Sequence, residues 1–311
     1  AMQHSTTTVP APDATPLHTN VWLPEGRPRA VVQIAHGMAE HSDRYERFAQ
    51  ALTDAGYAVY AHDHRGHKGT AGDHSDEGYF ADKDGWATAV ADMRAVTDRA
   101  RAEQAGLPVF LIGHSMGSFL SRSYIAEPAP DLAGVVLSGT AGDPGPIALA
   151  GIAVSTIQGK LRGRRHRSGI MNTLSFGQYN AAFKPNRTEF DWLSRDPAEV
   201  DKYVEDEWCG NVFTAGFYAD LLGGLRQINS DGLVARVPKD LPILVLSGDE
   251  DPVGAGGKGP TAVAAQYEQA GVEDVTLKLY PGGRHEMLNE TNRDEVTADI
   301  IAWLDARLAR R

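Results

Sequence analysis

The sequence predicts an α/β protein with a mostly parallel central sheet and helices on both of its faces. Apolar segments of strand length alternate with amphipathic helical segments over residues 29–138, which is the pattern of repeated strand, helix and strand units. The alternation resumes at residue 241 and continues to a C-terminal helix. Between these stretches, residues 141–237 have helical spacing and many aromatic residues, so we expect a helical insertion there.

The first predicted elements are two strands, residues 17–23 and 29–35, joined by a short connection that contains proline and glycine. A glycine-containing loop, residues 36–41, follows the second strand. Such a loop can present a free backbone N–H at the end of a central strand, so we expect it to supply half of an oxyanion hole. Helical spacing then predicts a helix over 42–55, and an apolar run predicts a strand over 57–61.

Three histidines follow this strand, in residues 62–67, which read HDHRGH. Hydrolases with two metal ions would need an aspartate in place of Gly66, directly before the last histidine. The sequence therefore predicts no metal site. It favours a structural role in which Asp63 and Arg65 brace the loop beside the active site.

The next strand ends in a Gly-x-Ser-x-Gly motif centred on Ser115. Residues 108–112 predict a buried strand and residues 118–126 a helix, so the motif is the turn between them. This setting is that of a nucleophile elbow, a sharp turn that lifts a serine hydroxyl above the sheet. Ser115 is therefore the predicted nucleophile. The flanking predicted elements are a helix over 84–105 and a strand over 132–138.

Residues 141–237 are expected to form a helical cap over the sheet, with residues 1–140 and 238–311 forming the core. Most aromatic residues of the cap are expected to be buried within it, and some to line an apolar pocket: Phe176, Phe183, Phe190, Trp192, Phe213 and Phe217. The basic run 160–167 is expected to be a solvated or mobile loop. Contact with an anionic membrane surface and contact with an acidic partner or substrate are the alternatives.

Two loops after late strands supply the partners that a serine nucleophile needs. A serine hydroxyl needs a base to accept its proton and a carboxylate to orient that base. Asp249 and Asp251 follow a strand predicted over 241–248, and His285 lies in a glycine-rich loop after a later strand. Asp251, directly before a proline, is favoured as the acid, and Asp249 is the alternative. The order serine, acid, histidine matches the predicted fold.

Composition limits the classes of partner. The 311 residues carry a net charge of −11, which argues against nucleic acid as a partner. The single cysteine, Cys209, excludes an internal disulfide and is compatible with a reducing cytosol. The first twenty residues show no signal peptide, so we expect a cytoplasmic protein. No cofactor is expected, and the sequence leaves the oligomeric state open.

Four stretches together resemble the monoacylglycerol lipase and lysophospholipase branch of the α/β-hydrolases, which also includes S33-type serine aminopeptidases. They are residues 36–45 (HGMAEHSDRY), 61–67, 113–117 and 248–253. The first is much more specific than the elbow motif. The resemblance extends over nearly the whole chain and implies the α/β-hydrolase fold.

Transferred position by position, the resemblance implies that Ser115 is the nucleophile, Asp251 the acid and His285 the base. It also implies that the backbone N–H groups of Met38 and Met116 form the oxyanion hole. One departure is visible after the third histidine, where the family usually continues with glycine and this chain has lysine. The departure falls in the local loop and on no catalytic position.

The function expected from these features is hydrolysis of monoacylglycerol or a similar single-chain lipid ester through an acyl-enzyme. A serine aminopeptidase of the same fold is one alternative, in which Glu205, Asp206 and Glu207 would bind a substrate amino terminus. A hydrolase-like protein that binds a small ligand without turnover is the other. The presence of all three catalytic residue types argues against a pure binding protein.

Overall fold

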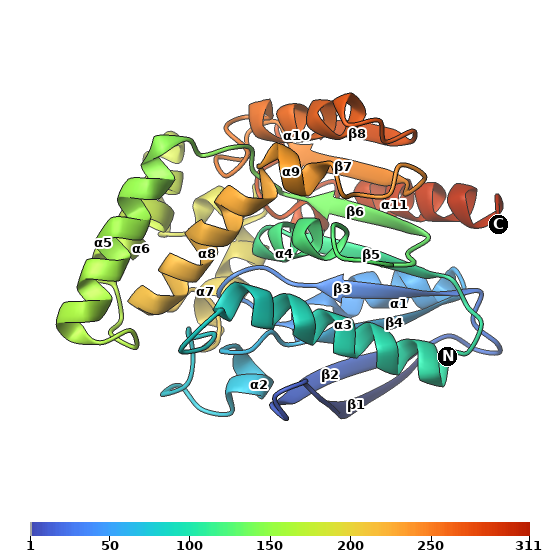
Figure 1. The fold of residues 1–311 in the computed structure, drawn as a ribbon. Helices are drawn as coiled ribbons and strands as arrows, with labels where there is room; N and C mark the ends of the chain where they lie inside the picture. Colours follow the sequence, from blue (N-terminus) through green and yellow to red (C-terminus); the bar gives the residue numbers. More distant parts are fainter. Residues whose placement is uncertain (1) are drawn as a thin grey trace.

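The computed structural model describes residues 2–311 and contains one eight-stranded sheet with the strand order β1-β2-β4-β3-β5-β6-β7-β8 (Figure 1). The strands from β4 to β8 in this order run parallel, and β1 and β2 are antiparallel to their neighbours. The strands are β1 (Gln3–Pro10), β2 (Pro16–Leu23), β3 (Ala30–Ala35), β4 (Tyr57–His62), β5 (Val109–His114), β6 (Gly134–Ser138), β7 (Ile243–Gly248) and β8 (Val275–Tyr280).

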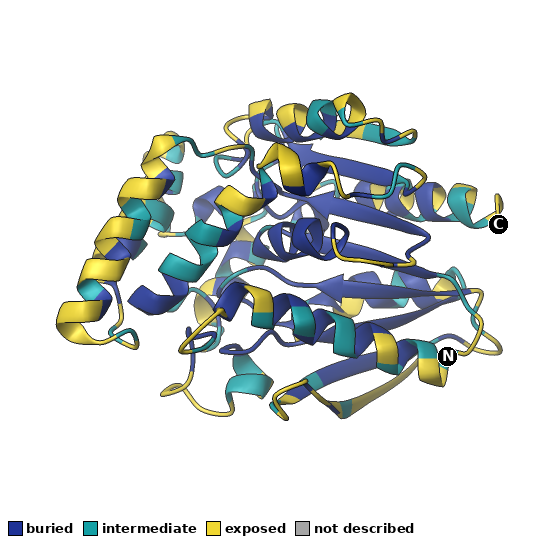
Figure 2. Ribbon diagram, in the orientation of Figure 1, coloured by how far each residue is buried: buried dark blue, intermediate teal, exposed yellow. Residues whose placement is uncertain are grey.

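Helices cover both faces of this sheet, as predicted (Figure 1). Those of the core are α1 (Glu46–Asp54), α2 (Lys68–Ala71), α3 (Gly85–Glu103), α4 (Met116–Tyr124), α10 (Lys258–Gln269) and α11 (Arg293–Leu308). Alternate residues of each buried strand face opposite layers. Val31 of β3 packs in the layer of α3, α4 and α10, whereas Val32 packs in the layer of α1 and α11. The central strands are buried along their whole length (Figure 2), which explains their continuous apolar runs.

The N-terminal strand β1 is the main element that the sequence analysis did not predict. It pairs with β2 along its length, from Gln3 opposite Leu23 to Pro10 opposite Pro16. Most of its residues are exposed because it is the edge strand, so it has no apolar run to indicate it. The predicted strands β2 and β3 are present, but β4 lies between them in the sheet.

The chain between β6 and β7 forms helices that lie beyond the carboxyl ends of the strands (Figure 1). These are α5 (Pro146–Arg162), α6 (Gly169–Asn172), α7 (Pro197–Glu205), α8 (Ala215–Ile228) and α9 (Asp231–Val234). Short turns complete the structure: 3₁₀ turns at Ser42–Tyr45, Asn180–Phe183, Asp191–Leu193 and Met287–Asn289, and a π turn at Thr173–Gly177. The predicted helix 42–55 is thus a 3₁₀ turn followed by α1.

The basic run 160–167 is not a simple loop. Its first three residues complete α5, and three of its arginines contact other segments. Arg164 pairs with Asp220 at 3.3 Å, and Arg165 pairs with Asp76 at 3.3 Å. Arg167 donates a hydrogen bond to the Val212 carbonyl at 2.9 Å. These contacts attach the end of α5 to neighbouring segments. Within residues 2–311, no helix is both long and apolar enough to cross a membrane.

Candidate active site

Ser115 occupies a turn of a single residue between β5 and α4. Its backbone has φ 53° and ψ −119°, a region that costs a non-glycine residue about 1–3 kcal/mol. A Cβ at Gly113 would lie 2.4 Å from the Gly117 carbonyl oxygen, and one at Gly117 would lie 2.0 Å from the Ala35 oxygen. Both glycines are therefore required by close backbone approach. The strand and the helix come closer to the serine than predicted, since β5 continues to His114 and α4 begins at Met116.

Asp251 and His285 are in direct contact. The His285 Nδ1 atom lies 2.8 Å from the Asp251 Oδ2 atom, and both side chains are buried. The other carboxylate oxygen of Asp251 accepts a hydrogen bond from the Val253 N–H at 2.9 Å. Asp249, the alternative acid, instead accepts a hydrogen bond from the Gly282 N–H at 2.8 Å. Asp251, and not Asp249, is therefore the carboxylate that contacts His285.

Ser115 and His285 line one cavity of about 30 Å³. Its lining comes from the loop around Met38, the elbow, the loop around His285 and the insertion: Gly37, Met38, Glu40, His114, Ser115, Phe176, Trp192, Leu193, Tyr203, His285 and Glu286. We refer to it as the active-site cavity. Burial disfavours a charged imidazole, but the Asp251 carboxylate outweighs this and raises the pKa of His285. A proton accepted by His285 is stabilised by that carboxylate.

The loop around Met38 is held by hydrogen bonds on both sides. The Gly37 N–H donates to the Glu40 carboxylate at 2.7 Å, and the Ala39 N–H donates to His67 Nε2 at 3.2 Å. Met116, the other predicted oxyanion donor, is the first residue of α4. The first amides of a helix have no acceptor within the helix, so this N–H is available to a ligand.

The sequence profile of the family described as "Serine aminopeptidase, S33" matches residues 26–292. The chain belongs to this family of hydrolases. It is 32% identical to the monoacylglycerol lipase of Mycolicibacterium smegmatis, over 93% of this chain and 92% of that protein. It is 31% identical to human monoglyceride lipase, over 94% of this chain and 88% of the relative.

A solved structure of a thermostable carboxyl esterase from Bacillus coagulans, in complex with glycerol, superposes with a TM-score of 0.91 at 29% identity. The match covers 99% of this chain and 100% of the esterase. These relationships confirm the predicted α/β-hydrolase fold and the resemblance stated from the sequence motifs. They also confirm the expectation of a hydrolase.

Buried histidines contact the loop that contains Met38. His36 Nε2 accepts a hydrogen bond from the His64 N–H at 3.0 Å, and His64 Nε2 lies 2.9 Å from the His36 carbonyl oxygen. Burial lowers the pKa of His36 and His64 well below the usual histidine value, and that of His62 to about 4. The neutral rings are therefore part of the folded loop structure, in agreement with the structural role predicted for this segment.

Asp63 and Arg65 brace the same region, but through separate partners. Asp63 accepts hydrogen bonds from the Ser42 N–H at 2.8 Å and its hydroxyl at 2.7 Å. Arg65 makes two hydrogen bonds to the buried carboxylate of Asp92, at 2.7 and 2.9 Å. A second partner of Arg65 is Asp13, near the end of β1. The two residues thus anchor the loop to different parts of the core.

A buried ion-pair network next to His285 was not predicted. Arg44 makes two hydrogen bonds to Glu286, at 2.7 and 2.9 Å, and one to Glu40 at 2.8 Å. Burial opposes ionisation of Glu286, but the Arg44 guanidinium prevails and lowers its pKa. The spacing of Glu40 and Arg44 suited an ion pair, whereas the approach of Glu286 depends on tertiary structure.

Among residues 2–311, two groups of side chains have ligand atoms close enough together to suggest a metal site. Glu40, His114 and Glu286 form one group, but Arg44 already pairs with both of its carboxylates. The second group consists of His41, Asp206 and Cys209. Here His41 Nε2 lies 2.6 Å from Asp206, and burial raises the pKa of the Cys209 thiol, which disfavours the thiolate that metals bind. Neither group includes His62, His64 or His67.

The insertion closes the active-site cavity with aromatic side chains. Phe176 and Trp192 line it, as expected for some of the cap aromatics, while Phe213 and Phe217 are buried in the core. The Trp192 ring centroid lies 5.1 Å from that of His285. A volume of about 30 Å³ holds one or two water molecules, so an acyl chain requires displacement of cap side chains.

The acidic residues considered for binding a substrate amino terminus are placed elsewhere. Asp206 accepts a hydrogen bond from the Trp208 N–H in addition to its contact with His41. Glu205 and Glu207 are exposed, and none of the three lines the active-site cavity. Nothing in this geometry favours the aminopeptidase alternative.

Proposed function

We propose that this protein is a serine carboxylic ester hydrolase that cleaves monoacylglycerol or a similar single-chain lipid ester through an acyl-enzyme. The observation that carries the proposal is the His285 to Asp251 hydrogen bond beside the strained elbow serine, Ser115. With Nδ1–H donated to Asp251, the Nε2 atom is free to accept the proton of the serine hydroxyl.

In the proposed reaction, Ser115 Oγ attacks the ester carbonyl carbon while His285 Nε2 accepts the hydroxyl proton. The backbone N–H groups of Met38 and Met116 donate to the oxyanion of the tetrahedral intermediate, where one such donor is worth about 3 kcal/mol. His285 then gives its proton to the leaving alcohol. Water repeats the sequence on the acyl-enzyme and releases the fatty acid.

The substrate class rests on the relatives and on the chemistry of the cavity lining. Two relatives with about 30% identity are named as lipases of monoacylglycerols. Phe176, Trp192 and Leu193 give the cap side of the cavity an apolar surface suited to an acyl chain, once these side chains move apart. Within this proposal, residues 141–237 form the cap and residues 1–140 and 238–311 form the hydrolase core.

The outer face of α5 supports a transient contact between the cap and a lipid surface. It exposes a row of large apolar side chains: Ile147, Leu149, Ile157 and Leu161. Leu161 alone is 81% exposed, and it lies between Lys160 and Arg162. An apolar helix face with basic residues beside it is suited to a surface that contains anionic lipid. We place this activity in a reducing compartment such as the cytoplasm, because the single cysteine is compatible with one.

The test is a hydrolysis profile over monoacylglycerols, lysophospholipids, p-nitrophenyl esters of graded length and aminoacyl amides, run beside Ser115→Ala. The proposal requires cleavage of monoacylglycerols or medium-chain esters by the wild type and no turnover by the variant. Exclusive cleavage of aminoacyl amides would replace it with the aminopeptidase function. No cleavage of any substrate, together with no labelling of Ser115 by a fluorophosphonate, would favour a binding protein.

A further inference from the structure

The loop that carries His285 is held by backbone hydrogen bonds to the insertion. Residues 191–196 of the insertion lie against this loop. The His285 N–H donates to the Trp192 carbonyl at 3.3 Å, and the Glu286 N–H donates to the Leu193 carbonyl at 2.8 Å. The peptide of the proposed general base is therefore anchored to the insertion and not only to the sheet.

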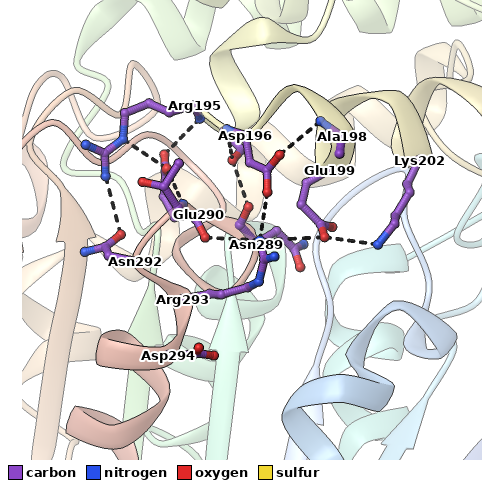
Figure 3. Close-up of polar contacts among 12 residues, drawn as sticks. Arg195, Asp196, Ala198, Glu199, Lys202, Asn289, Glu290, Asn292, Arg293 and Asp294 are labelled. Atoms are coloured by element: carbon purple, nitrogen blue, oxygen red, sulfur yellow. Dashed lines mark hydrogen bonds and ion pairs between the residues drawn. The ribbon is translucent and has the colours of Figure 1, made fainter.

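A buried carboxylate, Glu290, completes this attachment. It is 0% exposed and accepts hydrogen bonds from four N–H groups. One oxygen accepts from the Arg284 N–H at 3.0 Å and the Arg195 N–H at 3.1 Å. The other accepts from the Thr291 N–H at 2.8 Å and Arg195 Nε at 3.0 Å. Glu290 thus joins the residue before His285 to the backbone and the side chain of Arg195 in the insertion. Figure 3 shows Glu290 beside Arg195.

Further contacts join the same surfaces, and Figure 3 shows the ion pair between Arg293 and Asp196. Arg293, the first residue of α11, pairs with Asp196 of the insertion at 2.9 Å. The Ser194 hydroxyl donates a hydrogen bond to the Asn289 carbonyl at 2.8 Å. These contacts lie nearer the surface than Glu290 and touch no amide of residues 284–286.

We propose that Glu290 is a positioning residue that holds His285 toward Asp251 by fixing the histidine loop to residues 191–196. The inference rests on the proposed function, in which His285 is the general base. A catalytic side chain must be held to within about 0.5 Å of its productive position, and the surrounding hydrogen bonds provide this precision. Here the three amides 284–286 are fixed by one buried carboxylate and two insertion carbonyls.

The consequence for His285 depends on the charged groups around it. Asp251 contacts the ring directly, Glu286 and Glu40 lie near it, and the His114 ring centroid is 4.7 Å away. Burial opposes the charged imidazole, and the Asp251 carboxylate is the largest favourable influence on its pKa. If Glu290 no longer holds the histidine loop, the distance between His285 and Asp251 increases. The pKa of His285 then falls.

Glu290→Gln tests the role because glutamine has nearly the same shape but only one acceptor oxygen. Each Glu290 oxygen accepts two N–H groups, so the NH₂ group that replaces either oxygen faces two donors and is repelled by them. We expect kcat on a short, soluble p-nitrophenyl ester to fall about 10- to 100-fold with KM changed less than about twofold. The acid limb of the pH profile of kcat shifts to lower pH, and so does the His285 ring titration followed by NMR and assigned with His285→Ala.

Two further variants separate positioning from stability. Glu199→Gln removes a carboxylate that pairs with Arg293 on the same surface but does not contact the histidine loop, and it should leave kcat unchanged. Arg195→Ala removes one donor to Glu290 and leaves the backbone bonds in place, so a decrease of a few fold is expected. If Glu290→Gln does not fold, the kcat of Arg195→Ala tests the positioning role: a decrease of a few fold supports it, and an unchanged kcat overturns it.

The results distinguish this inference from the proposed function. An active wild type with a folded Glu290→Gln variant of unchanged kcat and unchanged His285 titration overturns the positioning role alone. An increase confined to KM also overturns it, because that would indicate an effect on substrate binding only. If the wild type cleaves no ester and a fluorophosphonate does not label Ser115, the proposed function fails and the positioning role fails with it.

Discussion

The substitution Asp251→Asn tests the geometry of the acid directly. Both oxygens of Asp251 are used: one accepts from the Val253 N–H at 2.9 Å and the other lies 2.8 Å from His285 Nδ1. Asparagine has only one acceptor oxygen. If that oxygen stays on the Val253 amide, the NH₂ group faces His285 and forces its proton onto Nε2, so the ring no longer accepts a proton from the serine.

The expected loss is large because the wrong tautomer removes the base and because a neutral amide no longer stabilises the imidazolium. We expect kcat on p-nitrophenyl butyrate at pH 7 to fall about 10³- to 10⁴-fold, equivalent to about 4–5.5 kcal/mol. Thermal unfolding should change little, since the two residues are nearly identical in shape.

Asp249→Asn is the matched control, because Asp249 lies two residues away and its carboxylate accepts from the Gly282 N–H instead of contacting His285. It should retain kcat within about threefold, as is usual for a change outside the reacting groups. A folded Asp251→Asn enzyme with kcat within tenfold of the wild type would refute the assignment of the acid. A large loss in Asp249→Asn would instead support the alternative acid.

Three further predictions follow from the site and its surroundings. Ser115→Gly should abolish turnover and raise the free energy of unfolding by about 1 kcal/mol, because glycine adopts φ 53° without strain. Stability should fall as the pH decreases from about 6.5 toward 4, because the unfolded chain binds protons that buried His36, His62 and His64 do not; above pH 6.5 these groups contribute no pH dependence. Each of these histidines lowers the free energy of unfolding by about 1.4 kcal/mol per unit decrease in pH over this range, measured by urea unfolding. Leu161→Glu should weaken binding to vesicles that contain anionic lipid, measured by co-sedimentation, without changing kcat on a soluble ester.

Each of these has a result that would contradict it. Unchanged or decreased stability of Ser115→Gly would show that the elbow is not strained. His62→Leu should remove one histidine from the acid slope, since its ring nitrogens have no hydrogen-bond partner among residues 2–311, and an unchanged slope would exclude His62 as a source. Equal vesicle binding by wild type and Leu161→Glu would exclude α5 as the contact surface.

The sequence predicted the central strands because their apolar character follows from burial on both faces. The runs that became β3, β5 and β7 are buried at every position, and glycines mark the turns after them. Strand β1 could not be predicted in this way, because it is held by backbone pairing with β2 and leaves most of its side chains in solvent. Local pattern carries no signal for such an edge strand.

The elbow and the order of Ser115, Asp251 and His285 could be predicted because each follows a recognisable strand. The ion pairs and hydrogen bonds around these residues could not be predicted. Glu286 meets Arg44 across 242 residues of chain, and Glu290 meets Arg195 across 95. No spacing rule relates such pairs before the sheet order and the position of the insertion are known.

Ser115 is proposed to carry the acyl group during ester cleavage. This can be tested by rapid mixing of the enzyme with a monoacylglycerol, acid quench within milliseconds, and intact-mass and peptide mass spectrometry. We expect a mass increase equal to the acyl group minus one hydrogen, located on the peptide that contains Ser115 and missing in Ser115→Ala. An acyl group on another residue, or cleavage by Ser115→Ala at the wild-type rate, would show that Ser115 is not the nucleophile.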